Sequence, residues 1–412
     1  MFRKISFRFL FRKLVLITLI LSYLAFLFFS EITLSVVLLM LALLFSVLLR
    51  TRLRLSIPVF IAWYTLFCGL LFVPFIYENI SHFWGNFIAL FAPLILFFIL
   101  RSVSVRSDDL SILKYMAWGL ALITSVQLII LYISSGGFLI KHYIEIPYGK
   151  SNSIASILLF TILFIFYTAD FNNWGKIRTI LFALFALGVL ILTQSAAGIL
   201  IYLFFIAWYV VGKTTWSQRL LVLGLLLIPL LILIPVITNR HQLTEKLGLG
   251  DPTEKAIIRK LDEQQSGTGM ASFMHKRLEA YVTGFDNFRN HPVFGVGIGN
   301  IKDTRNMFMT TEFIRTHNLF IDLLASTGVT GLLVYLMFLL YLFIAMRNKL
   351  LCLGGREYYY LRATRIAFIA VLVHAMVEPN FFNFKFSLFV FSFVLMALTA
   401  DLDQYNEKTI SE

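Results

Sequence analysis

Residues 276–300 read KRLEAYVTGFDNFRNHPVFGVGIGN, and residues 315–331 read RTHNLFIDLLASTGVTG. These two stretches hold most of the polar, chemically capable side chains that do not flank an apolar run. The sequence around them consists mainly of long apolar segments. Chemistry on a polar substrate is therefore expected here, and the rest of the chain is expected to hold these stretches in place.

The composition indicates an integral membrane protein. Of 412 residues, 59% are hydrophobic, 16% aromatic and only 14% charged, which excludes a water-soluble enzyme of ordinary composition. Much of the net charge of +13 flanks apolar runs, as membrane topology requires, so no nucleic-acid partner is expected. The remainder lies in the central loop and would attract an anionic, phosphate-bearing lipid. Cys68 and Cys352 fall in different environments, so neither a disulfide nor a zinc site is expected.

The apolar runs predict an all-α polytopic fold. A bilayer core about 30 Å thick requires roughly 20 apolar residues per helix, and such runs predict about twelve spans. They lie near 14–29, 32–49, 56–77, 83–100, 113–134, 153–169, 177–193, 196–212, 218–238, 327–346, 362–377 and 384–400. The first run resembles a signal peptide but lacks a small-residue cleavage site, so it is expected to remain as a span. One continuous helix over 177–212 would overshoot the bilayer, so TQSA at 193–196 predicts a hairpin turn.

The basic residues predict the orientation. Short loops on the side of the N-terminus hold most of the Lys and Arg, which is typical of cytoplasmic loops. Both termini are therefore expected inside, and the polar motifs outside. The chain divides into nine transmembrane helices over 1–238, a large outer loop over 239–317, and three transmembrane helices with a cytoplasmic tail over 318–412. A loop of this length is usually functional rather than connective.

The large loop contains a predicted amphipathic helix over 272–290. Its apolar residues recur at spacings of three and four, namely Met274, Leu278, Tyr281, Val282, Phe285 and Phe288. Pro292 is expected to end it. Arg277, Ala280 and Gly284 share one stripe, which would admit a large ligand, although the pattern alone favours a solvated charge on the outer face of the helix for Arg277. Gly295-Val296-Gly297-Ile298-Gly299 follows a helix instead of a strand, which favours a tight turn or close backbone approach over nucleotide binding.

Arg315-Thr316-His317-Asn318 stands where the loop re-enters the membrane. Thr316 is a candidate cap for the helix that follows. His317 at this interface is interpreted either as a tethering side chain or as a base.

Two further polar groups lie near the outer ends of spans. His374 and Glu378 are four residues apart on one helix face, so they either pair structurally or contribute to an outward pocket. Lys150-Ser151-Asn152-Ser153 is interpreted as a loop and helix cap. No His, Cys or carboxylate cluster has metal-ligand spacing, and no metal is expected. The spans carry no charge near mid-depth, which argues against an ion-coupled transporter.

The motif set resembles a known family. It comprises Arg277, HPxxGxGxG over 291–299, His317-Asn318-Leu319-Phe320 and TGxxG over 327–331. This set is similar to that of the O-antigen ligase and O-antigen polymerase superfamily of bacterial membrane glycosyltransferases. YGKSNSIAS (148–156) and TQSAAG (193–198) are similar to weaker upstream motifs of the family, and the predicted layout of spans extends the resemblance to most of the chain.

The resemblance implies a GT-C-like helical bundle in the bacterial inner membrane, with its active site facing the periplasm. Such an enzyme moves a glycan from an undecaprenyl diphosphate carrier to an acceptor hydroxyl, in contact with membrane lipid, without a cofactor or metal. In this reading Arg277 stabilises the departing diphosphate. His317 positions or deprotonates the acceptor hydroxyl.

The chain departs from the family at one position. Many members carry an arginine directly after the serine of the TQS-like motif, whereas this chain has Ala196. The candidates to replace it in binding the donor diphosphate are Arg315, Arg289 and Lys276. Asn318, Ser195, His374 and Glu378 are further candidates for the pocket.

The resemblance leaves two enzyme functions open. A ligase would transfer the glycan to lipid A-core, and a polymerase would transfer a growing chain to the next lipid-linked repeat. The ligase is preferred by analogy, because the compact loop and the Arg277 to His317 arrangement are similar to that branch. A lipid-linked sugar flippase and a purely structural membrane protein are the alternatives from other classes.

Overall fold

The structure is a computed structural model. It describes residues 58–77, 83–103, 107–136, 144–147, 149–169, 171–172, 174–211, 269–302 and 315–400, together with 14–18, 21 and 41–42. The helices of the described residues are α3 (Val59–Leu70), α4 (Phe83–Val103), α5 (Ser111–Ser134), α6 (Ser151–Thr168), α7 (Lys176–Leu192), α8 (Ala196–Val211), α12 (Gly269–Asn290), α13 (Leu319–Cys352), α14 (Gly355–Ala375) and α15 (Phe384–Thr399). Short 3-10 helices are η1 (Val73–Ile76), η2 (Ser107–Leu110) and η4 (Asn380–Phe382). Strands β1 (Glu145–Ile146) and β2 (Gly149–Lys150) pair antiparallel, with Glu145 opposite Lys150.

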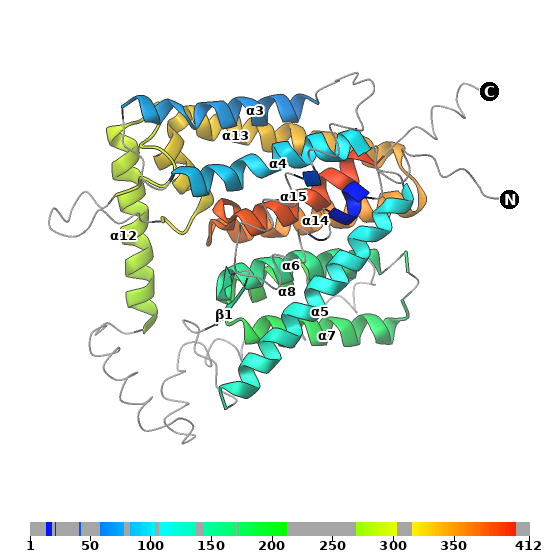
Figure 1. The fold of residues 1–412 in the computed structure, drawn as a ribbon. Helices are drawn as coiled ribbons and strands as arrows, with labels where there is room; N and C mark the ends of the chain where they lie inside the picture. The colour runs from blue at the N-terminus through cyan, green and yellow to red at the C-terminus, as the bar shows by residue number, and fades with distance from the viewer. Residues whose placement is uncertain are drawn as a thin grey trace, which may run out of the picture.

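The molecule is a helical bundle crossed at one end by a single helix. Figure 1 shows α12 at the left, standing across the ends of helices that run side by side to its right, with α5 oblique to them. The starts of α4, α6, α8, α13 and α15 gather at this α12 end, as do the ends of α3, α7 and α14. The polar loops between these helices therefore meet there.

The apolar helices support the prediction of an integral membrane protein. Within the described residues, five segments are long and apolar enough to cross a membrane: α3 with η1, α4, α5, α6 and α13. Helices α7, α8 and α15 are also apolar but shorter. The predicted spans at 14–29, 32–49 and 218–238 and the predicted tail after 400 lie largely outside the described residues. The count of about twelve spans therefore stays a prediction.

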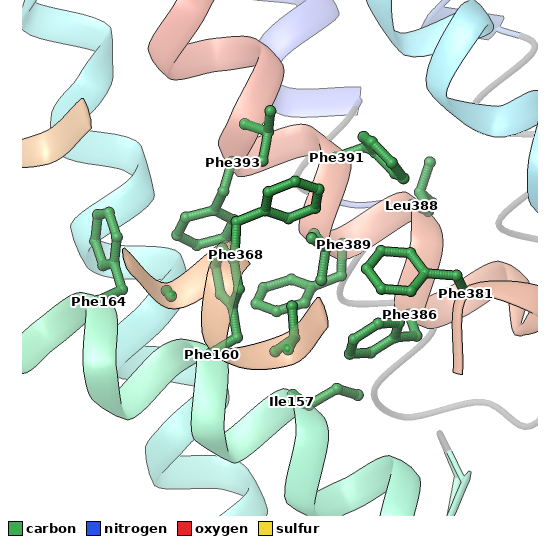
Figure 2. Close-up of a cluster of buried hydrophobic side chains, with 14 of the residues drawn as sticks. Ile157, Phe160, Phe164, Phe368, Phe381, Phe386, Leu388, Phe389, Phe391 and Phe393 are labelled. Atoms are coloured by element: carbon green, nitrogen blue, oxygen red, sulfur yellow. The ribbon is translucent and has the colours of Figure 1, made fainter. Parts of the chain in front are cut away.

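The helices are held together by an aromatic core. Phe160 and Phe164 of α6 contact Phe393 of α15 with ring centroids 5.2 and 5.1 Å apart, and Phe368 of α14 lies 5.9 Å from Phe391. Figure 2 shows these rings interleaved where the three helices meet. Lipid is as apolar as these side chains, so close packing supplies most of the association free energy in a membrane. Each such ring pair contributes about 0.5–1.5 kcal/mol beyond its buried area.

The predicted hairpin at TQSA is confirmed. Helix α7 ends at Leu192 and α8 begins at Ala196. The chain reverses through Gln194, which has a positive φ of 55°. Ser195 lies in this turn with 1% of its surface exposed. The α7–α8 turn is therefore a buried feature of the α12 end.

The two glycine motifs form one interlocked unit. The amides of Val296 and Gly297 donate to the carbonyls of Ala325 and Ser326 at 2.9 and 2.8 Å, and the amide of Val329 donates to the carbonyl of Pro292 at 2.9 Å. A Cβ on Gly295 would lie 2.3 Å from the backbone of Ser326. The expectation that the glycines permit close backbone approach is thus confirmed.

Gly328, in the second glycine motif, lies equally close to the backbone that leads into the first motif. A Cβ there would lie 2.3 Å from the backbone of Val293. Gly328 also has φ 64° and ψ −170°, which divides α13 into a short first segment and a long second one. The span predicted to start at residue 327 therefore begins at this break, and residues 319–327 form a separate helical segment at the α12 end.

We expect Gly328→Ala to destabilise the protein strongly. The φ/ψ region of Gly328 is essentially restricted to glycine and costs other residues about 1–3 kcal/mol, and the added methyl group would also overlap the backbone of Val293. The apparent melting temperature in detergent should fall by several degrees. Gly119→Ala is the control, because a Cβ at Gly119 of α5 meets nothing within 4 Å and alanine favours a helix interior. Equal melting temperatures for the two variants would contradict the interlock.

Candidate functional site

Arg277 belongs to α12, the helix that crosses one end of the bundle. The helix confirms the prediction over 272–290, and its close approach to α13 depends on Gly284, where a Cβ would lie 2.7 Å from both Thr316 and Ile321. Asn287 then fixes the end of the helix, because its amide nitrogen donates to the carbonyl of Lys302 at 2.7 Å. The part of the stripe at Gly284, which was expected to admit a ligand, is therefore filled by protein.

The start of α13 holds His317 in an unusual backbone conformation. Asn318 caps α13 by accepting hydrogen bonds from the amides of Phe320 and Ile321 at 2.9 and 3.2 Å. The prediction of Thr316 as the cap is wrong, because the hydroxyl and amide of Thr316 both donate to Asp322, at 2.5 and 2.7 Å. His317 between them has φ 56°. Its ring is thereby turned toward the loop after α14.

The imidazole of His317 contacts the carboxylate of Glu378 and is also partly exposed to solvent. Its Nδ1 lies 3.3 Å from Oε2 of Glu378, and 46% of the His317 side chain is exposed against 19% for Glu378. The same carboxylate oxygen accepts a hydrogen bond of 2.9 Å from the amide of Asn152 at the start of α6. The imidazole is therefore reachable from outside, while its partner is held from two sides.

The charges around Glu378 favour its ionised form. Burial raises the pKa of Glu378, but the hydrogen bond and charge of His317, the hydrogen bond from Asn152 and the positive charge of Arg277 together outweigh it. The net result is a pKa below the ordinary value of 4.5. Arg277 of α12 is therefore near enough for its charge to act on this carboxylate.

Arg315 provides a second guanidinium close enough to interact with the charge of Glu378. Its Nη2 donates to Oδ1 of Asn86 on α4 at 3.1 Å, and its guanidinium lies over the ring of Phe382, 5.6 Å from the centroid. Burial lowers the pKa of Arg315, and the carboxylates of Asp322 and Glu378 oppose that shift. An arginine remains protonated under such conditions. The site therefore contains two guanidinium groups that act on one carboxylate.

A buried network of polar side chains lies next to the contact between His317 and Glu378. His374 is 1% exposed, and its Nδ1 and Nε2 lie 2.9 and 3.4 Å from the hydroxyls of Ser156 and Ser195. Ser156 also accepts a hydrogen bond of 2.6 Å from Asn380, whose own oxygen accepts one of 2.8 Å from Ser153. The network joins α6, α14, η4 and the α7–α8 turn. Such buried networks rigidify a site when their members are satisfied.

The residues expected at the site thus separate into those gathered around Glu378 and those buried next to them. The structure gathers Arg277, Arg315, His317 and Glu378, and Asn318 lies beside them through its hydrogen bond of 3.0 Å to the carbonyl of Met376. Ser195 and His374 lie underneath and are buried, which favours a positioning role over direct contact with a ligand. The imidazole of His374 binds Ser156 and Ser195 while the carboxylate of Glu378 binds His317 and Asn152, so the expected side-chain pair of His374 with Glu378 is replaced by two adjoining sets of contacts.

One predicted donor-site cation, Arg289, lies away from the gathered residues. Arg289 is exposed, lies near Asp286 at 3.8 Å, and stands twelve residues from Arg277, about 18 Å along the axis of α12. Lys276 belongs to α12, but its side chain lies outside the described residues. Arg315 is therefore the candidate that the geometry favours as the second cation.

Sequence reasoning missed the role of Asn152 and Asn380. Asn152 was interpreted as part of a helix cap, whereas its side chain reaches across to Glu378. Asn380 bridges Ser153 and Ser156. The polar composition of KSNSIAS and EPNFFN at facing span ends is the signal that could have indicated the contact.

The arrangement suits proton transfer beside an anionic group. A carboxylate accepts hydrogen bonds only, so the contact with Glu378 places the proton of neutral His317 on Nδ1 and leaves a lone pair on Nε2. Arg277 and Arg315 supply positive charge to bind a phosphate-bearing group. Within the described residues, no group of three His, Cys, Asp or Glu side chains is placed to hold a metal ion.

Comparison with known proteins agrees with the resemblance found in the sequence. Residues 180–336 match the family described as O-antigen ligase. The matched segment includes Arg277, Arg315 and His317, and it ends just beyond the TGxxG motif at 327–331. No curated protein matches the chain significantly.

The depressed pKa of Glu378 predicts a pH dependence of stability. A carboxylate whose pKa is lower in the folded state stabilises the fold above its unfolded pKa, and that contribution is lost as the pH falls through the folded pKa. We expect Glu378→Gln to melt below the wild type at pH 7, and the difference to shrink as the pH falls below about 4.5. Thermal melting in detergent across this range measures it. Glu145→Gln, at an exposed carboxylate of β1, should follow the wild type throughout. A constant difference for Glu378→Gln would contradict the assigned charge.

Proposed function

We propose, from the match of residues 180–336 to the family described as O-antigen ligase, that this integral membrane protein is a glycosyltransferase of the ligase type. It takes a glycan from an undecaprenyl diphosphate carrier and transfers it to a sugar hydroxyl of lipid A-core. The helical bundle is GT-C-like, lies in the bacterial inner membrane, and presents its α12 end to the periplasm. The concentration of Lys and Arg in the loops opposite this end supports that orientation.

One observation carries the proposal. His317 contacts the carboxylate of Glu378, on which the charge of Arg277 also acts, and His317 and Arg277 both lie in the matched segment, which supports the proposal. A base next to a guanidinium is what transfer from a sugar diphosphate requires. The acceptor hydroxyl must lose a proton, and the departing diphosphate gains negative charge.

His317 acts as the base. The oxygen of the acceptor hydroxyl attacks the anomeric carbon of the donor, and its proton passes to Nε2 of His317. Glu378 is a positioning residue: it orients the ring through Nδ1 and stabilises the imidazolium that forms. Asn152 holds Glu378 in place through its hydrogen bond of 2.9 Å.

Arg277 binds the leaving group. The bond between the anomeric carbon and the diphosphate oxygen breaks, and its electron pair leaves with that oxygen. A guanidinium binds two phosphate oxygens at once, which stabilises this charge as it develops. Arg315 is the proposed second cation in place of the arginine that many family members carry where this chain has Ala196. The proposal requires no metal and no cofactor, because the two arginines supply the positive charge.

We expect His317→Ala and Arg277→Ala each to abolish measurable transfer. Loss of a general base lowers rates by about 10²–10⁴-fold, and loss of one group that stabilises developing charge lowers them by about 10²–10³-fold. Arg277→Lys should recover part of the activity, because lysine keeps the charge but lacks the planar fork. Complementation of a deletion strain and transfer by the purified protein are the two measurements.

Arg347→Ala is the matched control for these variants. Arg347 is an exposed cation near the end of α13 away from the α12 end. It should retain wild-type transfer at the same protein level. Activity that survives both His317→Ala and Arg277→Ala would refute the proposed mechanism and would favour a structural role for the protein.

Deletion of the gene in its host separates the ligase from the alternative, a repeat-unit polymerase that uses the same donor. Without a ligase, long glycan chains should remain on the undecaprenyl carrier, and lipid A-core should be bare. Without a polymerase, core should carry a single repeat. Gel electrophoresis and mass spectrometry of the extracted glycolipids read out both patterns, and core carrying long chains as in the wild type would exclude both enzymes.

A further inference from the structure

A groove opens on the outside of the bundle at the end opposite α12. It has a volume of about 710 Å³ and lies between α5 and the first half of α7. Helix α7 runs from this groove to the turn that contains Ser195, and Phe185, the lining residue nearest that turn, stands ten residues before Ser195, about 15 Å along the helix. It is therefore separate from the candidate site.

The floor of the groove is a cluster of three aromatic rings. Trp118 of α5 lies 5.8 Å from Trp174 and 5.4 Å from Phe182 of α7, and Trp174 lies 5.4 Å from Phe182. Tryptophan side chains concentrate at the boundary between the hydrocarbon and headgroup layers of a bilayer. The cluster thus places the groove at that depth.

The wall of the groove faces hydrocarbon. Leu181 and Phe185 line it with 62% and 49% of their surfaces exposed. They continue a row of exposed apolar side chains along α7 that consists of Ile177, Ile180, Leu184 and Ile191. An acyl chain that lies along α7 would cover this row.

A cation stands at the edge of the groove. Arg178 lines the groove one turn before Leu181 and is exposed. Within the part of the chain that the structure describes, its guanidinium has no ion-pair or hydrogen-bond partner. Basic side chains at a membrane surface attract anionic headgroups, so the charge at the rim complements a phosphate above an acyl chain.

We propose that this groove is a binding site for an anionic glycerophospholipid, whose phosphate contacts Arg178 and whose acyl chain lies on Trp118, Trp174 and Leu181. The groove thus combines a cation for the phosphate with aromatic and apolar side chains for the glycerol and acyl chain. The site does not depend on the transfer activity proposed above.

Native mass spectrometry of the delipidated full chain tests this site. The purified protein is mixed with equal amounts of phosphatidylglycerol and phosphatidylcholine that have identical acyl chains. The first bound lipid should favour phosphatidylglycerol about five-fold, the factor that one cation at a membrane surface supplies. Arg178→Gln should remove this preference.

Arg347→Gln is the matched control, because Arg347 is an exposed cation at the same end of the bundle but outside the groove. It should keep the preference of the wild type. An unchanged preference in Arg178→Gln would overturn the proposal, as would an equal loss in Arg347→Gln, since that result indicates general attraction to a basic surface.

A second variant keeps the test decisive if Arg178→Gln misfolds. Leu181→Trp fills the groove without changing the charge and should reduce the first bound lipid of both kinds several-fold. Circular dichroism and size-exclusion chromatography confirm that the variant is folded. Binding of both lipids at the wild-type level in folded Leu181→Trp would show that lipid binds elsewhere.

Discussion

The contact between the backbones at Gly295 and Gly328 fixes where the site residues stand. Gly295 follows α12 after a single turn, and Gly328 ends the helical segment that begins just after His317. A side chain on either glycine would overlap the backbone of the other segment. The two segments also exchange amide-to-carbonyl hydrogen bonds, which hold the end of α12 to the start of α13. Arg277 and His317 depend on this contact, although neither takes part in it.

Helix α6 provides the second fixed reference. Its start carries Asn152, Ser153 and Ser156, which bind Glu378, Asn380 and His374 from the C-terminal part of the chain. Its remaining length is buried among aromatic side chains of α14 and α15. The polar contacts at one end and the aromatic packing along the helix therefore fix the same helices relative to one another. The loop that carries Glu378 is aligned with His317 as a result.

Much of the local structure could be predicted from the sequence, because it depends on local signals. The spacing of apolar residues predicted α12, and the excess length of the apolar run predicted the α7–α8 turn at Ser195. The partners of polar side chains could not be predicted in this way. Helical periodicity shows that His374 and Glu378 share a face, but it does not show which helix lies opposite. Asn318 was missed as the cap because Thr316 is an equally good cap by residue type, and the choice between them depends on Asp322.

In the candidate site, too, individual residues could be identified from the sequence, but their partners could not. Arg277 and His317 were identified by resemblance, whereas their relation to Glu378 required the fold. Arg289 and Arg315 were equivalent in the sequence, since both are arginines in the same loop. The geometry separates them, because α12 carries Arg289 away from the loop that contains Glu378 while Arg315 is held between α4 and η4.

The two residues other than glycine that have positive φ, among those described, are Gln194 and His317, and both lie at the α12 end. Left-handed backbone at such residues costs about 1–3 kcal/mol and persists only where the surrounding packing enforces it. That free energy is supplied by folding, before any substrate arrives. In the reaction proposed above, the imidazole of His317 would therefore need little reorganisation, and such a site would be preorganised at the expense of stability.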